Sequence, residues 1–468
     1  MKFSPNDELL YNFLPFLVYL ALLLYLGFSG RNKDSDENEY LLGSRSLTLP
    51  AFVATLVATW YGGILGVGEF VYIYGISNWV VMGLPYYFFA LLFAWILAPK
   101  IRKADNFSIP DMFYRNYNRP VGLLGSIFIF IMISPAPYIL MLAVLLKIFL
   151  NVSFIWSLII GTLFSIVYVY NGGFRSVVKT DILQFFLMFI AFIILFIYLI
   201  RSDISLFDLP VALDKKHLSI NGGLSWQEIF VWFSIASWTF IDPGFHQRCA
   251  AAKTPQTARK AIIISVGFWF VFDMLTTASG LYAVVLLPDI NPLMSFPLLA
   301  QAVLPPFFQG IFFVGLTAII MSTVDSYTFL SALTLGRDII GHISLCEKFK
   351  DKNMPVKIGL LISAAAAVLL ILLIPSVIKL WYTLGSLFIP ALLLPLLGSY
   401  FEKIRISNRL TLFAMTGGFV ISFAAFLWGE LHQFDSFAQY LWNIEPFFPG
   451  LIFSILVYSM AILKNRTV

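Results

Sequence analysis

Apolar stretches long enough to cross a lipid bilayer follow one another along almost the whole of this 468-residue sequence. A helix needs roughly 20 apolar residues to span a hydrocarbon layer about 30 Å thick. Thirteen stretches meet this requirement, and they begin near residues 8, 47, 78, 119, 152, 174, 226, 258, 307, 357, 379, 408 and 447. The sequence therefore predicts an all-α integral membrane protein with about 13 transmembrane helices.

The composition excludes several other classes of protein. Charged residues make up 12% of the chain, about half of what a soluble globular domain carries, so a soluble multidomain enzyme is excluded. The net charge is +5, but the basic residues are scattered between apolar stretches and form no continuous patch for nucleic acid. Two cysteines, Cys249 and Cys346, are too few for a disulfide framework.

The basic residues predict the orientation in the membrane, because cytoplasmic loops collect Lys and Arg. Thirteen spans place the termini on opposite sides. With the N-terminus outside, the cytoplasmic side receives all but six of the 30 basic residues, the exceptions being Lys2, Lys147, Arg201, Lys215, Lys216 and Lys379. We therefore expect a multi-pass protein of the cell membrane with an outside N-terminus and a cytoplasmic C-terminus. The first apolar stretch is expected to be a retained span rather than a cleaved signal peptide.

The second apolar stretch carries an unusual concentration of glycine. Gly62, Gly63, Gly66 and Gly68 precede Glu69, and this composition predicts that the helix unwinds between about residues 58 and 68. Close packing of small residues against a neighbouring helix is the alternative, since Gly62 and Gly66 have GxxxG spacing. Glu69 also has a structural interpretation, as an acid satisfied by freed backbone amides.

A second interruption is predicted in the seventh stretch, where Pro243 and Gly244 follow Asp242. The two interrupted stretches open two groups of five spans, at 47–201 and 226–402. Inverted repeats arranged in this way place a binding site at the bilayer midplane, where freed carbonyl groups bind a cation. We expect a carrier that works by alternating access. The remaining parts are an extra N-terminal helix with its linker (1–46), an extracellular loop (202–225) and two C-terminal helices (403–468).

Five segments together resemble the sodium:solute symporter family, which includes sodium-coupled carriers of proline, sugars, pantothenate and choline. They read EYLLGSRSLTLPAFVATLVATWYGG, IPDMFYRNYNRP, NGGFRSVVKTDILQFFLMF, FHQRCAAAKTPQTARKAI, and a long last segment that contains MSTVDS and ends in RDII. The resemblance covers most of the chain, and the last segment is the most specific. It implies a five-plus-five inverted-repeat core whose first helix is broken in each repeat. It also implies sodium-coupled symport of a small organic solute, with Na⁺ as coupling ion and no other cofactor.

The resemblance also implies a sodium site. Its ligands would be carbonyl oxygens of Ala58, Tyr61 and Ile319 and the hydroxyls of Ser322 and Thr323. Each of these positions can supply the oxygen that a hard cation prefers. The alternative for the two hydroxyls is a hydrogen bond to a carbonyl one turn earlier in their own helix.

Some family members hold a second sodium ion through an acid that corresponds to Asp181 and through later hydroxyls, which correspond here to Asp325 and Ser326. Because Asp325 stands where those members have Ser, the group is a candidate for a second cation or for proton coupling. A plain salt bridge competes with both, and the expected partners of Asp181 are then Arg175, Lys179 or Arg337.

The candidate solute-binding residues lie at the two breaks and are Thr59, Trp60, Gly62, Gly63, Trp238 and Asp242. The sequence ATWYGG resembles the first break of the choline carriers more than that of the sugar carriers. An indole face holds a cation through its quadrupole, so a cationic amine or an amino-acid-like solute is expected. Trp60 could instead serve packing, and Asp242 could instead cap a helix.

Other functions are less well supported by the residues. None of the four histidines belongs to an HExxH motif or accompanies a GxSxG nucleophile, so an enzyme is not expected. A solute receptor built on a transporter core and a proton-coupled carrier remain as alternatives, whereas two breaks around one site disfavour a passive channel. The expected partners are the solute, Na⁺ and the lipid bilayer, without nucleic acid; the oligomeric state is left open.

Overall fold

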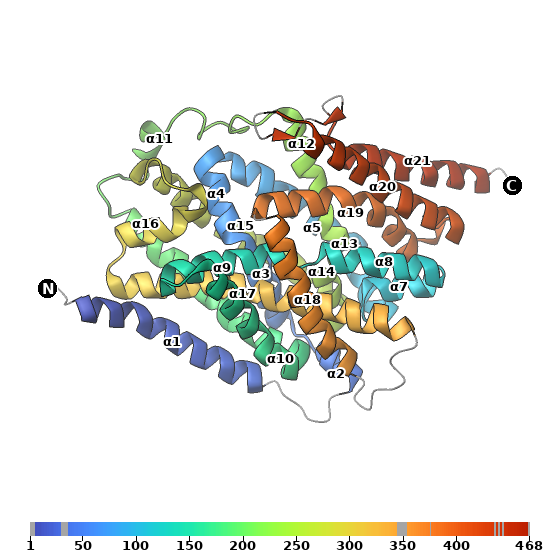
Figure 1. Cartoon of the computed structure of the whole chain (residues 1–468), viewed down its shortest axis with the longest axis horizontal. Helices are drawn as coiled ribbons and strands as arrows, with labels where there is room; N and C mark the ends of the chain where they lie inside the picture. Colours follow the sequence, from blue (N-terminus) through green and yellow to red (C-terminus); the bar gives the residue numbers. More distant parts are fainter. Residues whose placement is uncertain are drawn as a thin grey trace.

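The computed structural model describes residues 5–29, 36–343, 353–374, 376–434, 437–438, 440–441 and 444–466, and these form a helical bundle (Figure 1). The helices are α1 Pro5–Ser29, α2 Glu37–Leu42, α3 Leu49–Trp60, α4 Ile64–Tyr74, α5 Leu84–Ile96, α6 Ala98–Ala104, α7 Ile109–Asn116, α8 Arg119–Met132, α9 Ala136–Leu150, α10 Phe154–Leu199, α11 Leu209–Ala212, α12 Trp226–Ile235, α13 Trp238–Ile241, α14 Pro243–Ala251, α15 Pro255–Leu286, α16 Ser295–Val303, α17 Pro306–Leu333, α18 Met354–Leu373, α19 Val377–Tyr400, α20 Asn408–Leu431 and α21 Phe447–Arg466. Short 3-10 or π-helical turns occur at Gly43–Arg45, Tyr61–Gly63 (η2), Trp79–Gly83, Pro292–Met294, Thr334–Ile339 (η5), Ile340–Ile343 and Glu402–Ile404. Strands β1 Gln433–Phe434 and β2 Phe437–Ala438 pair in antiparallel fashion.

The predicted all-α membrane fold is confirmed. Among the described residues, 10 helical segments are long and apolar enough to cross a membrane. The other three predicted spans correspond to α1, to the first part of α10, and to the broken run from α12 to α14. The run from α12 to α14 is interrupted at Asp242, so no single helix of it is long enough to cross a membrane.

The helices of the interior contain the predicted site. In the most apolar part of Leu49–Tyr74, which joins α3 and α4, 83% of the residues are buried, and for Pro306–His342, which contains α17, the share is 78%. The corresponding shares for α20 and for Phe447–Lys464 in α21 are 28% and 33%, and these two helices lie together at one corner of the bundle (Figure 1). A helix that is apolar all round and buried packs against other helices, whereas α20 and α21 present apolar side chains to lipid.

A sharp break divides the long helix α10. Gly173 has φ 56° and ψ −149°, a conformation that is essentially restricted to glycine. Its Cα also lies against the backbone of Tyr40, where a Cβ atom would be 2.5 Å from the carbonyl oxygen. The break lies next to residue 174, where the hydropathy pattern predicts the start of a new span.

Loops that were predicted to share one side of the membrane do contact one another. Ion pairs join Arg45 to Asp105 at 2.9 Å and Arg175 to Glu39 at 3.1 Å. The segment before α3 also forms a parallel bridge, Leu47 with Ala252, to the segment after α14. On the other side, the Tyr282 hydroxyl donates to the carbonyl of Ile204 at 3.1 Å, and the His217 ring lies 3.0 Å from the carbonyl of Tyr72. The predicted division of the loops into two sets therefore agrees with the fold.

Gly173→Ala should lower the free energy of unfolding by about 1 to 3 kcal/mol, because alanine is strained at this backbone conformation. Thermal unfolding of the purified protein in detergent measures the effect. Gly267→Ala in α15 is the matched control. A Cβ at Gly267 meets nothing within 4 Å, so alanine should be neutral or stabilise the helix by up to about 1 kcal/mol. Equal unfolding temperatures for the two variants would contradict the strained break at Gly173.

Candidate solute and ion site

The first predicted break is present, but it is shorter than predicted. Helix α3 continues to Trp60, and α4 begins at Ile64, so the irregular part is the 3-10 turn at Tyr61–Gly63. The prediction of unwinding from 58 to 68 is wrong for both flanks. The glycine composition overestimated the length of the break, because Gly66 allows close packing of helices, which was the alternative interpretation. A Cβ atom at Gly66 would lie 3.0 Å from the indole of Trp381.

The second break is confirmed at Asp242, which is extended (φ −73°, ψ 114°) between α13 and α14. Its carboxylate accepts the backbone N–H of Phe245 at 3.1 Å, so the helix-cap interpretation also holds. The other carboxylate oxygen accepts the Tyr327 hydroxyl at 2.6 Å. Asp242 is thus anchored to α17 as well as to its own helix, and it is 2% exposed.

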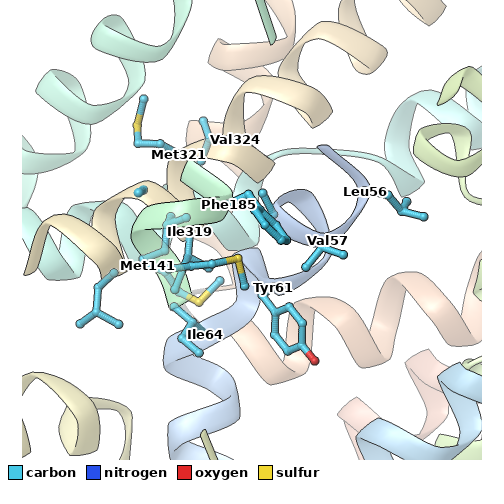
Figure 2. Packing of buried hydrophobic residues seen from close by; sticks show 14 of the residues in the cluster. Leu56, Val57, Tyr61, Ile64, Met141, Phe185, Ile319, Met321 and Val324 are labelled. Atoms are coloured by element: carbon cyan, nitrogen blue, oxygen red, sulfur yellow. The ribbon is translucent and has the colours of Figure 1, made fainter. Parts of the chain in front are cut away.

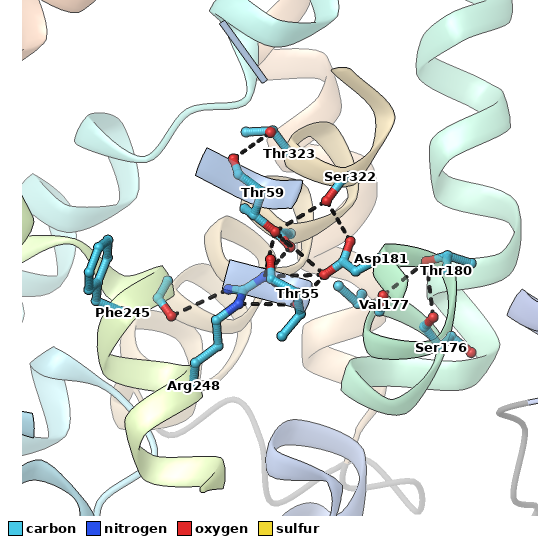
Figure 3. Close-up of polar contacts among 12 residues, drawn as sticks. Thr55, Thr59, Ser176, Val177, Thr180, Asp181, Phe245, Arg248, Ser322 and Thr323 are labelled. Atoms are coloured by element: carbon cyan, nitrogen blue, oxygen red, sulfur yellow. Dashed lines mark hydrogen bonds and ion pairs between the residues drawn. The ribbon is translucent and has the colours of Figure 1, made fainter. Parts of the chain in front are cut away.

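A buried ion pair lies beside the first break (Figure 3). Asp181 of α10 and Arg248 of α14 are both fully buried, and Nη2 of Arg248 is 3.3 Å from Oδ2 of Asp181. Ser322 donates to Oδ1 of Asp181 at 2.6 Å, and Thr55 donates to Oδ2. Two opposite charges can be buried at tolerable cost only when they are paired and hydrogen-bonded, and this cluster meets both conditions.

The partner predicted for Asp181 is therefore wrong. Arg175 pairs with Glu39, Lys179 donates to the carbonyl of Ser29 at 2.9 Å, and Arg337 pairs with Glu37, Asp111 and Asp338. The prediction failed because it considered basic residues near Asp181 in the chain and one, Arg337, in the η5 turn that follows α17. Arg248 comes to Asp181 from α14, 67 residues later in the chain, and the packing of α14 on α3 helps to bring the two together.

The hydroxyls predicted as sodium ligands lie next to the break. Thr323 donates to the backbone carbonyl of Thr59 at 2.6 Å, and Ser322 bonds Asp181 as described above. Both hydroxyls reach across to other helices, so the alternative of bonding to their own preceding turn is wrong. Figure 2 shows Ile319 packed in the same cluster as Tyr61. The structure thus brings the five predicted sodium ligands to one region, where Ala58, Ile319 and Ser322 are fully buried.

Of the three residues predicted to bind a second cation, Asp181 and Ser326 lie together at the buried ion pair. Ser326 lies next to the ion pair, with its hydroxyl 3.0 Å from Nη2 of Arg248. Asp325 is fully buried on α17, while the carboxylate of the cluster comes from Asp181. A role of Asp325 in cation binding or proton coupling stays a prediction.

A cavity of about 130 Å³ lies between the two breaks. Five of the six predicted solute-binding residues line it, namely Thr59, Trp60, Gly63, Trp238 and Asp242. Gly62 instead faces the side chain of Thr323. Further aromatic side chains from several helices complete the wall, namely Tyr86, Tyr87, Tyr138, Trp232, Phe245, Tyr327 and Trp381. The cavity is therefore lined largely by aromatic side chains, and the charged side chains in its wall are those of Asp242, Asp273 and Arg248.

The match to a family decides the class of protein. Residues 40–407 match the profile of the sodium:solute symporter family, which is more than three quarters of the chain. The chain belongs to the sodium:solute symporter family. It is a membrane-embedded, sodium-coupled secondary transporter of a small solute, and the prediction that it is not an enzyme is confirmed.

Relatives and solved structures agree with this membership. A sodium/proline symporter of Haemophilus influenzae is 25% identical over 96% of this chain and 94% of its own length. One of Staphylococcus aureus is 24% identical over 94% and 90%. In fold, this symporter resembles a Na⁺-coupled sialic acid symporter in a substrate-bound outward-open state, with TM-score 0.79, 17% identity and 98% coverage of both chains. It also resembles a nucleobase-cation-symport-1 family transporter, with TM-score 0.60, 13% identity, and coverage of 92% and 96%.

Two charged residues of the symporter's site were missed by the sequence analysis. Arg248 belongs to one of the segments that resemble the family, and it was counted among the basic residues of the cytoplasmic loops; this placement is wrong, because Arg248 is fully buried in α14 and pairs with Asp181. Asp273 of α15 is 7% exposed, lines the cavity, and accepts a hydrogen bond from the Tyr87 hydroxyl. An acid in the middle of a membrane span is a functional candidate by default, so the run ISVGFWFVFDMLTT carried a usable signal for Asp273.

Asp181→Asn should lower the free energy of unfolding by about 3 to 5 kcal/mol, because it leaves the Arg248 guanidinium buried without a counter-charge. Arg248→Gln should have an effect of similar size, and the double variant should lose much less than the sum of the two. Thermal unfolding of the four purified proteins gives the coupling energy. Strictly additive losses would mean that the two side chains do not form a coupled pair.

Proposed function

We propose that this symporter imports a small organic solute with an ammonium group, an amine or an amino-acid-like compound, together with Na⁺. The observation that carries the proposal is the aromatic cavity with Asp242 in its wall. A buried cation needs a counter-charge and weakly hydrating surroundings. The carboxylate at the second break and the ring faces of Trp60 and Trp238 supply these two elements.

The environment of Trp60 supports a ligand contact for its indole. The ring lies against Tyr86, Phe245 and Trp269, with centroid separations of 4.9, 5.4 and 5.3 Å. These neighbours fix its orientation at the cavity wall, and an oriented ring loses little entropy on binding. Asp273 adds a second carboxylate to the wall. Relatives named sodium/proline symporters agree with this class of solute, since the nitrogen of proline is charged at neutral pH.

We also propose the coupling ion and its ligands. Sodium binds the carbonyl oxygens of Ala58, Tyr61 and Ile319 and the hydroxyls of Ser322 and Thr323. The contact between Thr323 and the carbonyl of Thr59 supports this, because it brings α17 hydroxyls against main-chain oxygens beside the break. Bound sodium would join α3 to α17 and so favour the conformation in which the solute cavity is complete.

The orientation and the repeat boundaries are part of the same proposal. The excess of basic residues on one set of loops supports an outside N-terminus and a cytoplasmic C-terminus. The inverted repeats are proposed to be residues 47–201 and 226–402. The chain segments 1–46, 202–225 and 403–468 then lie outside the repeat core. One break in each repeat, at Tyr61–Gly63 and at Asp242, supports this division.

Matched pairs of solutes test the solute class. Choline should bind in the presence of sodium, whereas its carbon isostere, with a tert-butyl group in place of trimethylammonium, should not. Proline and cyclopentanecarboxylate form a second pair with the same contrast. Binding is measured by thermal shift of the purified protein and by counterflow in proteoliposomes, each with sodium or with potassium. Equal responses to both members of each pair would refute recognition of an ammonium group.

For whichever ammonium solute binds, Trp60→Leu should weaken binding by up to about 30-fold, since a dry cation–π contact is worth about 2 kcal/mol. Trp60→Phe, which keeps a ring, should lose less. Trp156→Leu is the matched control because Trp156 is 61% exposed on α10, away from the cavity. Sodium-dependent binding without counterflow would instead favour the receptor, and counterflow driven by protons without sodium would favour the proton-coupled carrier.

The double variant Ser322→Ala with Thr323→Ala should raise the sodium concentration for half-maximal uptake by about 10- to 100-fold, because each lost hydroxyl ligand is worth about 1 kcal/mol or more. Thr317→Ala on the same helix is the control, since the Thr317 hydroxyl bonds the carbonyl of Phe313 within α17 at 2.8 Å. An unchanged sodium requirement in the double variant would exclude these hydroxyls as ligands.

A further inference from the structure

We propose that the cavity holds a second ammonium site, formed by Asp273 and Asn78, and that the preferred solute therefore carries two positively charged nitrogens, as a diamine or a basic amino acid does. The inference rests on the proposed recognition of an ammonium group and adds a second such group to the solute. Both residues line the cavity, and neither belongs to the two breaks or to the proposed sodium ligands.

Asp273 is a buried carboxylate with one hydrogen bond from a hydroxyl. It lies in the 32-residue helix α15, is 7% exposed and accepts a hydrogen bond from Tyr87. In the part of the chain that the structure describes, no basic side chain forms an ion pair with Asp273 or with Asp242. Arg248 also lines the cavity, but its guanidinium is paired with Asp181 at 3.3 Å. A carboxylate inside a membrane protein is stabilised by a nearby cation, and a hydroxyl does not supply one.

Asn78 gives an independent indication of a ligand beside Asp273. It is 1% exposed and lines the cavity. Its amide nitrogen donates to the Thr277 hydroxyl at 3.5 Å, and Thr277 follows Asp273 by one turn on the same face of α15. The amide oxygen of Asn78 has no hydrogen-bond partner among the described residues. A buried amide oxygen is rarely left unbonded, and an ammonium group has three hydrogens, enough for this oxygen and for the carboxylate.

The two acids of the cavity are held from different helices. Asp242 lies between α13 and α14 and accepts the Tyr327 hydroxyl of α17, whereas Asp273 lies on α15. Its hydroxyl donor, Tyr87, comes from α5. Each acid is therefore a separate position for a positive nitrogen, and a solute with two nitrogens can occupy both.

The Trp60 ring adjoins both positions. It lies 5.4 Å from the ring of Phe245, the residue whose backbone N–H bonds Asp242. It also lies 5.3 Å from the ring of Trp269, which precedes Asp273 by one turn of α15. An alkyl chain between two ammonium groups can cover this apolar surface while the nitrogens reach the carboxylates. The wall thus matches a solute that is apolar in the middle and charged at both ends.

Alkyl diamines and monoamines of equal chain length test the inference. Putrescine, cadaverine and hexamethylenediamine are compared with butylamine, pentylamine and hexylamine by titration calorimetry of the purified full-length protein in sodium. At least one diamine should bind about 10-fold or more tightly than its monoamine, since the second charged contact lies in surroundings that screen poorly. Monoamines that match all three diamines, but bind more tightly than the alcohols of the same length, would overturn the second site and leave recognition of an ammonium group intact. Amines that bind no better than the alcohols would fail the proposed function itself.

Asp273→Asn keeps the size of the side chain and removes its charge. The ratio of diamine to monoamine affinity should fall from about 10-fold or more to about one. Asp289→Asn, in the exposed loop after α15, is the matched control and should keep the wild-type ratio. An unchanged ratio in Asp273→Asn would overturn the assignment of the second site to Asp273. Where Asp273→Asn does not fold, the comparison of amines on the wild-type protein decides.

Discussion

The buried contact between Arg248 and Asp181 constrains the arrangement of all the helices around the first break. Neither charge could remain inside the bundle without the other, because the cost of removing an ion from water far exceeds that of a lost hydrogen bond. Thr55 and Thr59 of α3 and Ser322 and Ser326 of α17 complete the set of hydrogen bonds. The pair therefore fixes how α3, α10, α14 and α17 approach one another.

Close packing makes that approach possible. Gly62 leaves room for the side chain of Thr323, and Gly66 leaves room for the indole of Trp381. Without a hydrophobic driving force between helices in lipid, small residues of this kind allow backbones to approach and hydroxyls to reach across. Gly62 thus belongs to the turn at Tyr61–Gly63 and also gives Thr323 the room to reach the carbonyl of Thr59, so one glycine serves both the break and the proposed ion site.

The residues that line the cavity come from two kinds of position in the sequence, the two breaks and ordinary apolar stretches. The cavity takes Trp60 from the first break and Asp242 from the second, and these two were accessible to sequence analysis because both stand at interruptions of apolar stretches. The remaining wall comes from residues such as Tyr138, Trp232 and Trp381. Their stretches carry many aromatic residues, and nothing in the local pattern separates those that face the cavity from those that face lipid.

The sequence by itself determined the membrane-spanning fold, the start of each span, the two breaks and the family, because hydropathy, glycine and proline act locally and the family motifs are contiguous. Tertiary structure decided which charges meet. Asp181 pairs with Arg248, 67 residues away, and Asp273 meets Tyr87 across two helices. Helix rotation and packing set these contacts, and the apolar spans are hydrophobic on nearly every face, so their sequences carry little information about which face turns inward.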